Sequence, residues 1–158
     1  MFTTDNKITL TKLKDKINKI SKNNKILKVG FLTAEMSKIA VANEYGGIYP
    51  VSESYRNRAL SEGVNLGSTI SIIPRPFMLT TVKNHKKQWN QILLNKLKNN
   101  DSIKALSILG EIIKTDIQNT ISNNNFIENP PHIVKIKGRN QPLIDSGKMR
   151  NSVDYEIK

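Results

Sequence analysis

The chain has 158 residues, 37% of them hydrophobic, and carries a formal net charge of +12 with a pI near 9.9. This size and apolar content predict a single domain over residues 1–158 with a core of its own. The lack of cysteine excludes disulfides and thiolate chemistry, and no stretch reaches the roughly 18 apolar residues of a membrane helix, so we expect no membrane partner.

The first element is an N-terminal amphipathic helix within residues 1–24. Leu10, Leu13, Ile17 and Ile20 recur at spacings of three and four, with lysines between them. A strand is predicted over Ile26–Thr33, bounded by the turn signal of the preceding asparagines. The first residues lack the basic and then apolar pattern of a signal peptide, so we expect synthesis and first action in the cytoplasm.

A short helix is predicted over Ser37–Tyr45, ended by glycines. The stretch Asn43, Glu44, Tyr45 and Gly46 closes it. At such a helix-to-loop turn, the polar pair is expected to bond to backbone groups rather than to act in catalysis. Residues 48–68 follow as a long loop rich in glycine and serine, with one weak helical piece around Ser52 to Leu60, which we interpret as a contact loop.

A strand over Thr69–Ile73 leads into a corner formed by Pro74, Arg75, Pro76 and Phe77. Each proline fixes its own φ and keeps the residue before it extended, so Arg75 is held in a set direction. We expect its guanidinium to donate to backbone carbonyls or to a carboxylate such as Glu44 or Asp145.

Two long helices are predicted next, over residues 76–98 and from about residue 102 to residue 122. The second has a broad apolar face, which indicates a central helix or one at a subunit contact. Together with the strands they predict an α+β fold: a small mixed or antiparallel sheet with two long helices packed on one face, plus the N-terminal helix.

The last quarter begins with a flexible basic loop, residues 129–142, in which Ile133–Ile136 is a possible short strand. Asp145, Ser146 and Gly147 then form a turn, with Asp145 expected to cap one helical turn. Alternation of apolar and charged residues predicts a terminal strand from Val153.

The sequence contains no recognisable catalytic pattern. It has no glycine-rich phosphate loop, no nucleophile elbow and no histidine–acid cluster, and neither His85 nor His132 has a partner at metal-ligand spacing. We therefore expect a protein that is not an enzyme and has no cofactor.

The basic charge has two possible origins. Lysines can bind phosphate backbones non-specifically, and the candidate nucleic-acid contacts are Lys12, Lys16, Lys19, Lys135, Lys137 and Arg139. The chain also holds 20 Lys, 19 Asn and 21 Ile but only five Arg, a balance typical of AT-rich codons and a solvated surface. The composition favours the second origin and leaves a basic nucleic-acid-binding module as the alternative function.

Three stretches, in this order, resemble the neck and tail-completion proteins of bacteriophages and prophages, also labelled virion morphogenesis or tail-component proteins. The first is Asn43-Glu44-Tyr45-Gly46 and the second is Ile73-Pro74-Arg75-Pro76-Phe77-Met78. The third is Pro142-Leu143-Ile144-Asp145-Ser146-Gly147-Lys148-Met149-Arg150-Asn151-Ser152, in which Ser146 stands where the family usually has threonine.

The resemblance implies a virion protein that is assembled in the bacterial host cytoplasm. Such a protein acts by binding, in tail completion, as a tail terminator or in head–tail joining. The implied partners are copies of itself in a ring, expected to be a hexamer, tail tube or sheath proteins, head–tail connector proteins and, non-specifically, DNA. We further expect the three stretches to meet in space, tied together by Arg75.

Overall fold

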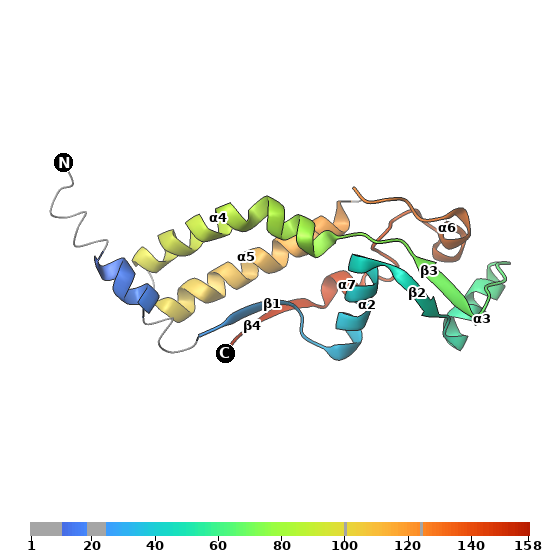
Figure 1. Ribbon diagram of the computed structural model, residues 1–158, viewed down its shortest axis with the longest axis horizontal. Coiled ribbons are helices and arrows are strands. Elements are labelled where there is room, and N and C mark those ends of the chain that lie inside the picture. Colours follow the sequence, from blue (N-terminus) through green and yellow to red (C-terminus); the bar gives the residue numbers. More distant parts are fainter. Residues whose placement is uncertain (1–10, 19–24, 100, 124) are drawn as a thin grey trace.

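The computed structural model describes residues 11–18, 25–99, 101–123 and 125–158 (Figure 1). It confirms the α+β class. The elements in chain order are β1 (Leu27–Phe31), α2 (Ala34–Tyr45), β2 (Gly47–Pro50), α3 (Glu53–Ser61), β3 (Thr69–Ile72), α4 (Phe77–Asn99), α5 (Ser102–Ser122), α6 (Pro131–Lys137), α7 (Lys148–Asn151) and β4 (Val153–Ile157). Residues 11–18 are helical, and the remainder of the predicted N-terminal helix lies outside the described residues.

The strands form two separate antiparallel pairs, β1 with β4 and β2 with β3. Helix α5 packs on both β1 and β4, and α4 packs on α5. Figure 1 shows these layers filling one part of an elongated molecule, with the β2–β3 ribbon, α3 and α6 at the other end. The two long helices are therefore stacked as successive layers, with α5 in direct contact with the sheet.

Helix α5 is central, as its broad apolar face predicts. Asp101 caps its N-terminus by accepting a hydrogen bond from the backbone N–H of Lys104 at 2.8 Å. Gly110 lets the helix approach β4 closely, because a Cβ there would lie 2.5 Å from the ring of Tyr155. The main core joins α5 to the other layers through the buried residues Ala40, Phe77, Ile117, Ile121, Leu143, Met149 and Val153.

Two predicted loops contain regular structure. The expected contact loop, residues 48–68, includes most of β2 and all of α3, which confirms the helical piece predicted around Ser52 to Leu60. Ser52 caps this helix by accepting from the N–H of Tyr55. In the expected loop 129–142, the possible strand Ile133–Ile136 is wrong, because these residues lie in α6. Pro131 starts this helix without losing a needed donor, and Gly138 ends it in the left-handed conformation.

None of the described helices is both long enough and apolar enough to cross a lipid bilayer.

Candidate functional site

The three stretches that carry the resemblance meet in the folded chain, as expected. The backbone N–H of Arg75 donates to the carbonyl of Asn43 at 2.7 Å. Gly46 lies so close to Pro74 that a Cβ there would be 2.7 Å from the proline ring. The side-chain amide of Asn43 is 4.0 Å from the sulfur of Met149, in the third stretch.

A cavity of about 380 Å³ opens where these stretches meet. Its wall comes from α2, from β3 and its exit, from α6 and from the turn before α7. Most of the wall is apolar and includes Ile39, Ile72, Ile133 and Met149. The cavity therefore has the mainly apolar wall with a few polar groups that is typical of binding sites.

Glu44 joins the first stretch to the second. Its buried carboxylate accepts hydrogen bonds from the backbone N–H groups of Met78 at 2.8 Å and Leu79 at 3.0 Å, in the first turn of α4. Asn43 donates to the carbonyl of Ile39 in its own helix at 2.9 Å. Both residues thus bond to backbone groups, as predicted. Glu44 caps the N-terminus of α4 and does not bond within α2, the helix to which it belongs.

Arg75 is buried, and its side chain bonds to residues 127–129 instead of to Glu44 or Asp145. Nε donates to the carbonyl of Ile127 at 3.0 Å, and Nη2 donates to the carbonyl of Glu128 at 3.4 Å and to Oδ1 of Asn129 at 3.1 Å. The expectation of backbone carbonyls is confirmed, whereas Glu44 and Asp145 as partners are wrong. The guanidinium joins the corner to residues 127–129, and the main chain of Arg75 bonds to the first stretch. The expectation that the Arg75 side chain ties the three stretches together is therefore wrong.

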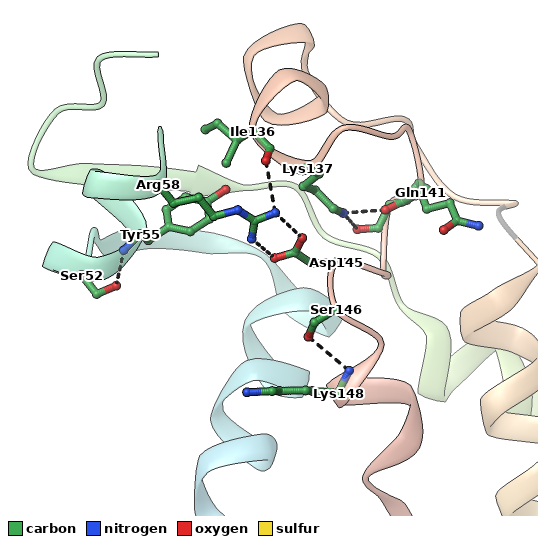
Figure 2. A network of polar contacts seen from close by, with 10 residues as sticks. Ser52, Tyr55, Arg58, Ile136, Lys137, Gln141, Asp145, Ser146 and Lys148 are labelled. Carbon is green, nitrogen blue, oxygen red and sulfur yellow. Dashed lines mark hydrogen bonds and ion pairs between the residues drawn. The ribbon is translucent and has the colours of Figure 1, made fainter. Parts of the chain in front are cut away.

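Asp145 pairs with a residue from the predicted contact loop. Its carboxylate accepts two hydrogen bonds from Arg58, at 2.6 and 2.9 Å, and Arg58 also donates to the carbonyl of Ile136 (Figure 2). The bond to Arg58 lowers the pKa of Asp145. The prediction that Asp145 caps the following helical turn is wrong, because its carboxylate is bound to Arg58. The N–H of Lys148 instead donates to Ser146 Oγ at 3.4 Å.

The remaining residues of the three stretches differ in exposure. Phe77 is fully buried and meets the ring of Phe31 edge-on, with ring centroids 5.9 Å apart. Tyr45 is 76% exposed. Pro74, Pro76 and Arg150 are also exposed, whereas Gly147 lies on the cavity wall with a positive φ of 80°.

The candidate nucleic-acid contacts do not form one surface. Lys12 and Lys16 lie beside the end of α4, and Lys16 donates to the carbonyl of Leu97 at 2.6 Å. Lys135 and Lys137 belong to α6 at the opposite end of the molecule (Figure 1), with Arg139 just after it. Lys19 lies outside the described residues. The N-terminal lysines and the cations in and after α6 therefore cannot bind one short stretch of nucleic acid together.

Lys137 is also engaged in the fold. Its ammonium donates to the carbonyl of Gln141 at 2.5 Å and to that of Pro142 at 3.3 Å (Figure 2). Burial lowers the pKa of Lys137 to about 8. Lys137 is also one of the residues that line the cavity.

Replacing Arg75 with Lys should destabilise the protein by about 1–3 kcal/mol. Lysine keeps the charge, but one ammonium cannot reproduce the bonds that Nε and Nη2 make to Ile127 and Asn129. Urea unfolding would measure the loss. The control is Arg150→Lys, at an exposed arginine whose Nε donates to neighbouring Asn151. Equal stability of the two variants would contradict a fixed guanidinium at position 75.

The sequence pointed to Arg75 and Asp145 but missed Arg58 and Asn129 as site residues. Arg58 lies in the predicted contact loop, two positions after Arg56, and its partner Asp145 is 87 positions away. Asn129 stood among residues typical of a turn. No local signal in the sequence identifies either partner.

The fold and this site define a small α+β protein with a mainly apolar cavity, to which Arg75 and Lys137 bring positive charge, where the three stretches meet. Among the described residues, no group of three or more His, Asp or Glu side chains is arranged to hold a metal ion. Comparisons of the chain with protein-family models, with curated proteins and with solved structures gave no match.

Proposed function

We propose that this chain is a structural protein of a bacteriophage or prophage neck, which completes the tail or joins it to the head by assembling into a ring. It acts by binding and not by catalysis. The observation that supports this function is the meeting of the three stretches that resemble the neck and tail-completion family. They come from positions up to about a hundred residues apart, yet they bond to one another and share one cavity.

Ring closure requires that one face of each subunit match a different face of the next. The most exposed large apolar side chains include Tyr45, Ile48 and Leu79, which are 76%, 75% and 64% exposed. They lie around the first two stretches, because the N–H of Leu79 is bonded to Glu44, next to Tyr45. Exposed aromatic and aliphatic residues of this kind are the usual anchors of a protein interface.

Light scattering after size exclusion, together with negative-stain imaging, tests the function. We expect rings from the protein alone or with the tail-tube protein, and no rings from the double variant Tyr45→Ser/Ile48→Ser. Ile103→Ser is the matched control, at an exposed isoleucine on α5. A protein that stays monomeric with and without the tail-tube protein would refute the proposal.

A further inference from the structure

Arg75 is a buried cation without a buried anion. Its side chain is 5% exposed, and all three of its acceptors are uncharged oxygens. None of the ion pairs formed within the described ranges includes Arg75. Because burying an unpaired charge is costly, a buried guanidinium normally faces a carboxylate or phosphate. The charge of Arg75 is therefore left for a group that the described chain does not supply.

Asn129 adds an unused donor at the same place. Its Oδ1 accepts from Arg75, which fixes the orientation of the amide and leaves Nδ2 pointing elsewhere. Nδ2 is buried and has no hydrogen-bond partner in the described part of the chain, and the residue as a whole is only 7% exposed. A buried N–H group left unbonded costs about 1–3 kcal/mol. Asn129 and Arg75 both line the cavity, so an acceptor bound there would serve Arg75 directly and Asn129 once its buried amide turned toward the cavity.

The charges around the cavity are unbalanced. Lys137 brings a second, half-buried cation to the wall, where it donates to two backbone carbonyls and interacts electrostatically with the carboxylate of Asp145. Two acids also line the cavity, Glu35 and Asp145. Asp145 is already bound by both terminal nitrogens of Arg58, and Glu35 lies on the exposed first turn of α2. The interior of the cavity therefore favours an anion.

The shape and lining of the cavity favour an extended peptide over a free ion. Four consecutive residues, Ile70–Ile73, line it, so the edge of β3 and not only one face borders the space. The N–H of Val51 bonds to the carbonyl of Ser68. Backbone groups alternate between the two edges of a strand, so those of Ile70 and Ile72, like that of Ser68, point toward β2. The backbone groups of Thr69 and Ser71 therefore point away from β2. No other described strand pairs with that edge.

We propose that this cavity receives an acidic side chain from an extended segment of a partner protein, with the carboxylate bound by Arg75, Asn129 and Lys137. Apolar neighbours of that side chain would fill the apolar wall, and the segment's backbone would pair with the free edge of β3. A partner of opposite charge fits better than a second copy, because each copy carries a net charge of +12. This inference does not depend on the proposed neck function.

The variant Asn129→Asp tests the need for an anion, since it places a carboxylate where the amide now lies. If the site lacks an anion, the variant should raise the thermal midpoint by about 2–4 °C. If instead the site is satisfied as it stands, a new buried carboxylate should lower the midpoint. Asn90→Asp, at an exposed position of α4, is the control for the general effect of adding one negative charge to a chain with a net positive charge.

Titration followed by NMR tests the ligand class. Sodium acetate at constant ionic strength should shift the Asn129 side-chain amide and the Arg75 Nε–H signals saturably, and Asn129→Asp should abolish the shift of the Arg75 Nε–H signal. The peptide acetyl-Thr-Ile-Glu-Ile-Thr-amide should bind about tenfold more tightly than its Gln counterpart. It should also bind more tightly than acetate.

Each alternative result would overturn the proposal. Absence of saturable shifts rejects the anion site, and saturation by inorganic phosphate but not by acetate rejects the carboxylate. A Glu peptide that binds no better than acetate rejects the extended segment. An oligomer that dissociates in Asn129→Asp would make the occupant a second copy.

Discussion

A Gly46→Ala variant is expected to lose at least about 3 kcal/mol of unfolding free energy. Gly46 has φ 68° and ψ −171°, a combination that only glycine adopts without strain, at a cost of about 1–3 kcal/mol for other residues. An added Cβ would also lie 2.7 Å from the carbonyl oxygen of Ile72 and 2.8 Å from the nitrogen of Pro74. Since both atoms belong to the backbone, the corner itself must move, which adds a cost of overpacking.

Two other glycines separate these causes. Gly138 also has a positive φ, but a Cβ there would meet nothing within 4 Å. Gly138→Ala should therefore show strain alone, of about 1 kcal/mol. At Gly67 there is neither a positive φ nor a neighbour, so Gly67→Ala should be close to neutral. Urea unfolding of all three variants is the measurement, and a loss at Gly46 no larger than at Gly138 would show that the close approach to Pro74 carries no stability.

The sequence was most informative where patterns are long. Three-and-four spacing located α4 and α5 to within a few residues, because helices of this length bury a continuous stripe. It failed for β2 and α6, with four and seven residues. The strands β3 and β4 are just as short, but clear alternation or a proline corner marked them. At β2 and α6 the periodicity is too weak to separate strand from helix, and packing and the caps decide.

The candidate site was predicted in part. Resemblance to the neck and tail-completion family placed the three stretches together, and the prolines around Arg75 indicated a side chain held in one direction. Its partners could not be predicted, because Ile127, Glu128 and Asn129 are more than fifty positions away and offer carbonyl or amide oxygens that any sequence contains. A pairing rule based on opposite charges selects Glu44 and Asp145 instead, and the fold uses both for other purposes.

A Glu44→Ala variant is expected to lose about 2–3 kcal/mol of unfolding free energy, because α4 depends on this residue for its N-terminus. The carboxylate accepts from the N–H groups of Met78 and Leu79, two of the four that a helix start leaves without partners, and its charge faces the positive end of the helix dipole. Alanine leaves both N–H groups without that acceptor in a partly buried position.

Glu44→Gln distinguishes the contribution of the charge from that of the hydrogen bonds. Glutamine retains one acceptor oxygen, so it should lose less than alanine but still about 1 kcal/mol. Glu111→Ala, at an exposed position of α5, is the control and should change stability by less than about 0.5 kcal/mol. If Glu44→Ala unfolded at the same urea concentration as Glu111→Ala, the carboxylate would not be what holds the second stretch against the first. In that case Gly46 and the bond from Arg75 to Asn43 would have to do so alone.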